Sequence, residues 1–95
     1  MSDDPRAEAQ RKIMDSPVRE GDIWRHRKGG LYQVVGFALD EATREPVVLY
    51  QPHLSDDSES LPWSRPLHVF LQRDPDGVPK FALVERADMP QGATP

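Results

Sequence analysis

The stretch that decides the fold is Asp-Ile-Trp-Arg-His-Arg-Lys-Gly-Gly-Leu-Tyr-Gln-Val-Val-Gly-Phe-Ala-Leu, residues 22–39. It opens with the alternation of a β-strand, which places Trp24 and His26 on one face and Arg25 on the other. Two adjacent glycines then predict a tight hairpin turn, because glycine readily adopts a positive φ. Residues 31–39 are apolar on both faces and predict a long second strand.

A glycine inside this second strand, Gly36, indicates a bulge or sharp bend of the kind that lets a sheet curl. Further strands are predicted at 46–51, 61–65 and 80–85, and a single helical turn is predicted at 67–71. The fold class is therefore mainly β, a small five-stranded SH3-like barrel or roll. Closing the sheet is physically favourable because it protects strand edges that carry apolar residues.

The two ends of the chain differ from this β region. Asp4 followed by proline suits the start of a short helix, but isolated helices this short are marginal in water, so it would fray unless Ile13 and Met14 docked on the core. The C-terminal end has prolines, a glycine and no aromatic residue, which predicts disorder. We expect a flexible or helical arm, an SH3-like domain and a disordered tail at residues 1–18, 19–86 and 87–95, with a long irregular loop at 52–62.

Composition bounds the class of protein. Ninety-five residues allow one domain with a small core. There is no cysteine, so disulfides and cysteine-based zinc sites are excluded, and a cytoplasmic location is favoured. No apolar run approaches the roughly 20 residues that a membrane helix needs.

The charge is unevenly placed. A net charge of −4 argues against a general nucleic-acid binder, because phosphate binding depends on clustered positive charge. Arg25, Arg27 and Lys28 nevertheless lie within four residues and could hold one anionic group or an acidic partner. The alternative is that they are solvated charges that keep a small β domain soluble.

A second motif, Trp-Ser-Arg-Pro-Leu-His-Val-Phe at 63–70, again places a tryptophan near an arginine. The aromatic residues of the two motifs and of the strand between them either fill the core or line a groove for an extended peptide. Together the motifs suggest one partner-binding site, whose candidate residues are Trp24, Arg25, His26, Lys28, Tyr50, Trp63 and Arg65.

Two of these residues have alternative roles. Arg65 either pairs with a carboxylate such as Asp22 or Glu45 and locks the barrel, or grips a carboxylate or phosphate of a ligand. His26 either forms a cross-strand hydrogen bond or acts as a pH-sensitive ligand contact.

Catalysis has little support in the sequence. The three histidines lack metal-type spacing, the serines lack a nucleophile elbow, and the glycines form no phosphate-cradling motif. We therefore expect no catalytic residue, no metal and no cofactor, and the protein is more consistent with a binding module than with an enzyme.

The residues at 21–28, 32–38, 47–51 and 63–70 resemble a bacterial family known as domain of unknown function 1653. Its members typically read Gly-x-x-Tyr-Arg-His-Tyr-Lys-Gly, then Tyr-x-Val, Val-Val-Tyr and Trp-x-Arg-Pro-Leu-x-x-Phe. The resemblance implies an SH3-like β roll and brings no established activity with it. Two departures stand out: Trp24 and Arg27 occupy positions where the family usually has tyrosine.

The function expected from the sequence is binding without catalysis. The partner is expected to be a segment or acidic surface of another protein, for which aromatic residues supply contact area and the basic residues supply charge pairing. The alternative is RNA or a small anion bound by the same basic and aromatic patch. A small enzyme is the remote third reading, and no membrane partner is expected.

Overall fold

The computed structural model describes residues 4–53 and 61–86. The elements are, in chain order, α1 (Pro5–Asp15), β1 (Ile23–His26), β2 (Leu31–Leu39), β3 (Pro46–Pro52), β4 (Trp63–Pro66), α2 (Leu67–Phe70) and β5 (Phe81–Glu85). The mainly β class is confirmed, and each predicted strand is present with ends within two residues of those expected. The predicted tail, 87–95, and residues 54–60 of the predicted loop lie outside the described residues.

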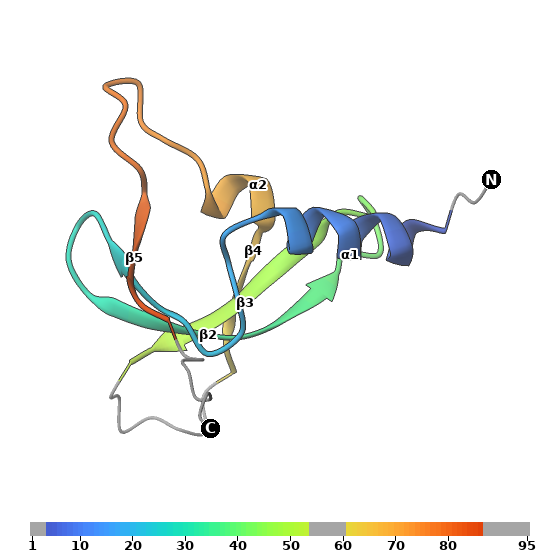
Figure 1. Cartoon of the computed structure of the whole chain (residues 1–95), viewed down its shortest axis with the longest axis horizontal. Coiled ribbons are helices and arrows are strands. Elements are labelled where there is room, and N and C mark those ends of the chain that lie inside the picture. Colours follow the sequence, from blue (N-terminus) through green and yellow to red (C-terminus); the bar gives the residue numbers. More distant parts are fainter. Residues whose placement is uncertain (1–3, 54–60, 87–95) are drawn as a thin grey trace, which may run out of the picture.

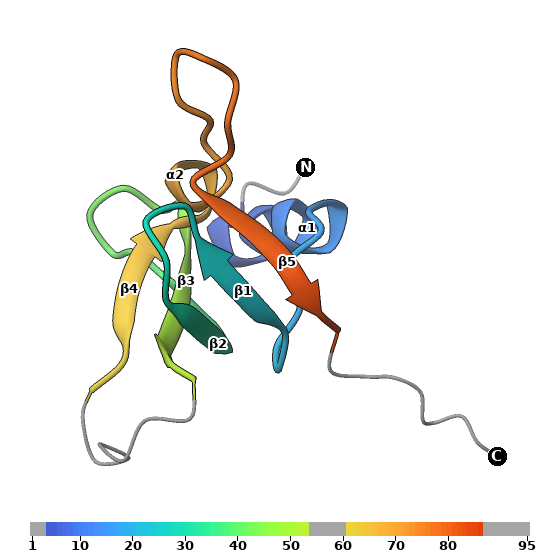
Figure 2. The same ribbon diagram turned by 90° about the vertical axis from the view of Figure 1, so that its left-hand side faces the viewer.

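The five strands form one antiparallel sheet in the order β4-β3-β2-β1-β5. Figure 2 shows the strands fanning from β4 at one side to β5 at the other. These two strands are the edges of the sheet and do not pair with each other, so closure into a barrel is not confirmed. The sheet therefore keeps an opening between its edges.

The bend predicted at Gly36 is present in β2. The register between β2 and β3 shifts between Val34 and Gly36, so that β2 carries one extra residue there. The predicted hairpin turn is also present: Gly29 and Gly30 have φ of 100° and 87°, values that side-chain-bearing residues rarely adopt. These two features set the curl of the sheet and the position of the β1–β2 turn.

The core lies on the concave side of the sheet and is rich in aromatic residues. Phe70 of α2 is fully buried and stacks on Phe81 of β5, with ring centroids 4.2 Å apart and planes 9° apart. Trp24 meets the Phe70 ring edge-on at 5.3 Å. The buried cluster consists of Val18, Trp24, Val34, Val48, Tyr50, Leu67, Phe70 and Phe81.

The N-terminal segment forms a capped helix that packs on the sheet (Figure 1). The Asp4 side chain accepts a hydrogen bond from the Arg6 backbone N–H at 3.0 Å, and proline begins the helix, as the sequence indicates. Ala9 is buried and Ile13 packs against the core, whereas Met14 is 67% exposed. Ile13 thus holds α1 on the core, whereas Met14, which was expected to dock beside it, does not. Neither helix in the described residues has the length and apolar character needed to cross a bilayer.

A buried carboxylate ties the two ends of the domain together. Asp22, which is 0% exposed, accepts a hydrogen bond from the Arg19 backbone N–H at 2.8 Å. It also forms an ion pair with Arg86 at 3.3 Å. Since Asp22 precedes β1 and Arg86 follows β5, this pair holds the outer edge strand against its neighbour.

Candidate functional site

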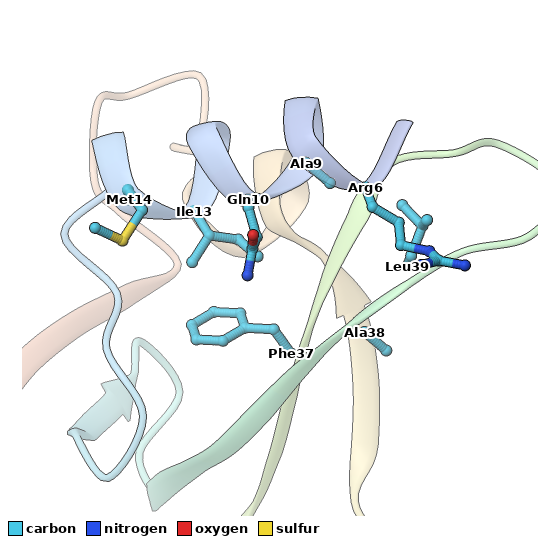
Figure 3. A pocket seen from close by; sticks show the side chains of 8 residues that line it. All are labelled: Arg6, Ala9, Gln10, Ile13, Met14, Phe37, Ala38 and Leu39. Atoms are coloured by element: carbon cyan, nitrogen blue, oxygen red, sulfur yellow. The ribbon is translucent and has the colours of Figure 1, made fainter. Parts of the chain in front are cut away.

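Two concavities of the described surface have nearly equal volumes and differ in chemistry. The first, here called the α1 groove, has a volume of about 360 Å³ and lies between α1 and the bent half of β2 (Figure 3). Ile13 projects from the helix toward Phe37 on the strand. The α1 groove contains none of the predicted site residues; its lining is Arg6, Ala9, Gln10, Ile13, Met14, Phe37, Ala38 and Leu39.

The second concavity, here called the aromatic groove, has a volume of about 370 Å³. Every strand of the sheet contributes at least one side chain to it, so it exists only because the sheet curls. Its lining residues are His26, Lys28, Gly29, Tyr32, Tyr50, Trp63, Arg65 and Phe81. Five of the seven residues predicted from the sequence meet here: His26, Lys28, Tyr50, Trp63 and Arg65.

The other two predicted residues do not line this groove. Trp24 is buried in the core, where its indole Nε1–H lies 3.4 Å from the Asp22 carboxylate. Arg25 is exposed and lies between Trp24 and His26 on β1, so strand alternation directs it to the opposite face. The basic patch seen in the sequence is therefore divided between two faces of the sheet.

Phe81 forms the floor of the aromatic groove. One side of its ring stacks on Phe70 in the core. The His26 ring meets it edge-on at 4.9 Å, and the Arg65 guanidinium lies over it, 5.4 Å from the ring centroid. Arg65 on β4 thus reaches across the opening to Phe81 on β5, and a cation–π contact connects edges that no backbone ladder joins.

The predicted set of site residues omits Phe81 and Tyr32, although Tyr32 was among the aromatic residues expected either to fill the core or to line a groove. Phe81 reaches it because β5 pairs with β1, which sets Phe81 opposite His26. Tyr32 joins it through an edge-on contact with Tyr50, at 5.5 Å between centroids. Tyr32 lies on the second predicted strand, but no sequence signal identified β5 as a neighbour of β1.

The electrostatics at His26 are set by cations. Its Nδ1 accepts a hydrogen bond from the Lys28 backbone N–H at 3.1 Å, which leaves the ring proton on Nε2 in the neutral form. Burial lowers the pKa of His26 below its ordinary value of 6.5, and the charges of Arg65, Lys28, Arg27 and Lys80 lower it further. His26 is therefore a neutral hydrogen-bond donor within a positive field at neutral pH.

Tyr50 has the opposite perturbation. Burial of its hydroxyl raises the pKa above the ordinary value of 10, and the nearby Tyr32 adds to this. A hydrogen bond from Arg65 and the charge of its guanidinium act in the other direction without cancelling the effect of burial. The Tyr50 hydroxyl therefore stays protonated and contacts Arg65 as a neutral group.

The cations around the groove differ in how they are neutralised. Arg27 forms an ion pair with Asp74, and the Lys80 ammonium donates a hydrogen bond to the Gln72 side-chain oxygen at 3.1 Å. Within residues 4–53 and 61–86, no carboxylate forms an ion pair with Arg65 or Lys28.

The carboxylates that the sequence offered as partners of Arg65 are engaged elsewhere. Asp22 pairs with Arg86, and Glu45 pairs with Lys12 at 3.1 Å. Arg65 and Lys28 therefore carry positive charge that the described part of the chain leaves uncompensated. Chemically, the groove offers cationic and neutral hydrogen-bond donors above an aromatic floor, an arrangement that is able to pair with an anionic group.

Comparison with known proteins decides the family. The family model described as protein of unknown function (DUF1653) matches residues 22–83. The chain belongs to the DUF1653 family. A crystal structure of a DUF1653 protein from Bordetella bronchiseptica is similar, with 29% sequence identity and a TM-score of 0.57, and the match covers 79% of this chain and 96% of that one. No curated protein matches the chain.

The two departures from the DUF1653 pattern have structural roles. Trp24 keeps an aromatic ring in the core against Phe70, and its indole N–H approaches Asp22. Arg27 pairs with Asp74 in the turn that precedes β5. Neither side chain lines the aromatic groove, so the groove in this DUF1653 protein does not use either position directly.

Proposed function

We propose that this DUF1653 domain is a non-catalytic binding module of the SH3-like type, and that its aromatic groove holds an acidic segment of another protein. One observation carries the proposal: Arg65 and Lys28 face a groove in which no described carboxylate pairs with either of them. An acidic side chain of the partner would supply a countercharge to these two cations. Since arginine presents a planar fork of donors, Arg65 suits a bidentate contact with a carboxylate.

The aromatic residues supply the contact area. Trp63 is 63% exposed at the start of β4, and Tyr50 pairs with it across the sheet. A large exposed tryptophan beside a groove is typical of surfaces that bind extended peptides, because aromatic rings bury much area at small cost in side-chain entropy. We expect the partner segment to cover the Trp63 ring while its acidic group reaches Arg65.

The test is a titration of the isotope-labelled full chain with short acidic peptides, followed by amide NMR. We expect shifts at the aromatic groove. Arg65→Gln is expected to weaken binding by about tenfold or more, because it removes a charge-assisted contact. Arg25→Gln is the matched control: it removes the same charge from the opposite face of the sheet and is expected to change the affinity by less than about twofold. Equal effects of the two substitutions would contradict the proposal, because they would show only a response to net charge.

RNA is the second candidate, and the exposed Trp63 beside two cations is the observation that favours it. The net charge of −4 stands against it. Salt separates the two partners: affinity for RNA falls steeply as salt rises, since each neutralised phosphate releases counterions. A peptide bound through one ion pair and aromatic contacts responds far less.

The proposed binding module is expected to act in the cytoplasm, because the sequence contains no cysteine.

A further inference from the structure

The donors that face the aromatic groove differ in shape and come from three separate elements. Arg65 on β4 offers a planar guanidinium, and Lys28 in the β1–β2 turn offers an ammonium with three freely directed donors. His26 on β1 offers one ring N–H, because its Nδ1 is already occupied by the Lys28 backbone N–H. All three side chains line the same groove.

This donor set exceeds what one carboxylate needs. A carboxylate has two oxygens, and the guanidinium fork alone can satisfy them in a bidentate contact. A phosphoryl monoester has three strong acceptor oxygens and a charge of about −1.5 to −2 near neutral pH. Two cations and a third donor, which come from two strands and a turn, therefore match the charge and the number of acceptor oxygens of a phosphoryl group better than those of a carboxylate.

We propose that the acidic group bound in the aromatic groove is a phosphoryl monoester carried by the partner segment, and that Arg65, Lys28 and His26 contact its terminal oxygens. This inference rests on the proposed function and specifies its ligand. The walls support it as well, because Tyr32, Tyr50 and Trp63 offer apolar surface to the residue that carries the phosphoryl group. That contact distinguishes a segment-borne phosphoryl group from free phosphate.

His26 provides an internal reporter of such binding. The charged groups that face it are Arg65 from β4, Lys28 and Arg27 from the β1–β2 turn and Lys80 from the approach to β5, with Arg27 partly neutralised by Asp74. All four cations lower the pKa of His26, after the larger effect of burial. A dianion placed among them opposes this field, so its binding is expected to raise the pKa of His26.

The experiment titrates the full-length labelled protein at about pH 7 with phenyl phosphate, benzoate and inorganic phosphate, followed by amide and histidine NMR. Phenyl phosphate and benzoate share an aromatic ring and differ in the acidic group. We expect phenyl phosphate to bind about tenfold more tightly than either of the other two, with shifts at His26, Trp63 and Arg65. We also expect it to raise the pKa of His26.

Two variants complete the design. Arg65→Gln is expected to reduce the affinity for phenyl phosphate by about tenfold, and Arg25→Gln to leave it within about twofold. A dispersed amide spectrum of each variant serves as the control for an intact fold.

The outcomes separate the inference from the proposed function. Equal affinity for benzoate and phenyl phosphate would overturn the phosphoryl assignment and leave an acidic-segment site in place. Inorganic phosphate binding as tightly as phenyl phosphate would overturn the segment-borne ligand and assign free phosphate. If none of the three probes shifts groove residues at concentrations up to about 20 mM, while acidic peptides do, the phosphoryl assignment fails alone. If the acidic peptides also leave the groove residues unshifted, both the proposed function and the phosphoryl assignment are contradicted.

Discussion

The α1 groove and the aromatic groove are almost the same size, about 360 and 370 Å³, yet their linings differ in chemistry. The α1 groove lies where a helix is docked on a bent strand, and its deeper side chains, such as Ile13 and Phe37, also pack against the core. The aromatic groove lies where the sheet curls, and its walls carry cations without described carboxylate partners. The two grooves therefore cannot be told apart by volume. They differ in the side chains that line them, and of the two only the aromatic groove combines two cations with several aromatic rings.

The comparison predicts a division of mutational effects. Substitutions of the side chains in the α1 groove that pack against the core should lower stability and leave ligand binding unchanged. Substitutions of the exposed side chains in the aromatic groove should lower binding and leave stability nearly unchanged. Phe81 is the exception, because its ring belongs both to the core and to the floor of the aromatic groove.

The largest effect is expected at Phe81, where one substitution should lower both stability and binding. Phe81→Ala removes a buried ring from the stack with Phe70 and should cost about 3–5 kcal/mol of unfolding free energy. Urea denaturation measures this cost. Leu83→Ala is the control on the same strand and should cost less than about 1 kcal/mol, because Leu83 is exposed. Similar losses for both variants would show that Phe81 is not part of the core.

The next effect concerns the α1 groove. Ile13→Ala should destabilise the protein by about 1–2 kcal/mol, since a partly buried anchor of α1 is lost while the helix cap remains. Met14→Ala, at an exposed neighbouring position, should change stability by less than about 0.5 kcal/mol. Thermal denaturation followed by circular dichroism compares the two. Affinity for phenyl phosphate should be the same in both variants, and a loss in Ile13→Ala would mean that the two grooves are coupled.

A smaller effect on stability is expected at the rim of the aromatic groove. Trp63→Ala should change the unfolding free energy by less than about 1 kcal/mol, because its ring is mostly exposed. Its effect on ligand affinity should be about tenfold, since the ring is expected to cover part of the bound segment. Peptide titration by calorimetry, beside urea denaturation, tests both parts. A large loss of stability would place Trp63 with the structural residues instead.

The smallest effect is a dependence of stability on pH at His26. Its pKa is lowered in the folded state, so the unfolded chain binds the proton more readily. The contribution of His26 to stability is therefore fully present above the ordinary pKa of 6.5 and is lost as pH falls from there toward the folded pKa. His26→Gln should flatten this part of the stability profile, measured by urea denaturation across the range. A steeper profile in the variant would contradict a lowered pKa of His26 in the folded state.

Much of the architecture could be read from the sequence because it depends on local signals. The paired glycines predicted the hairpin turn, Gly36 predicted the bulge, and the apolar run along 31–39 predicted the long strand. Alternation also separated Arg25 from His26 across the sheet. The predicted site nevertheless grouped them, because their closeness along the chain was given more weight than the faces to which they belong.

The rest depended on contacts between distant segments. Periodicity does not say which strands are neighbours, so the pairing of β5 with β1 that brings Phe81 beneath His26 was not foreseen. The partner of Arg65 was missed for a related reason. A charge suggested a carboxylate partner, and the structure offers an aromatic ring and a tyrosine hydroxyl. Docking of α1 likewise rests on tertiary packing of Ile13, which helix propensity does not reveal.

The pairing of the first strand with the last has a consequence for how the protein is made. A ribosome delivers β1, β2 and β3 early, and these can form hairpins as they emerge, but Phe81 arrives only with β5. Until then, Trp24 and Phe70 lack the ring that completes their cluster. Until β5 has emerged, the nascent chain therefore exposes aromatic surface of this cluster, and exposed apolar surface of this kind promotes aggregation.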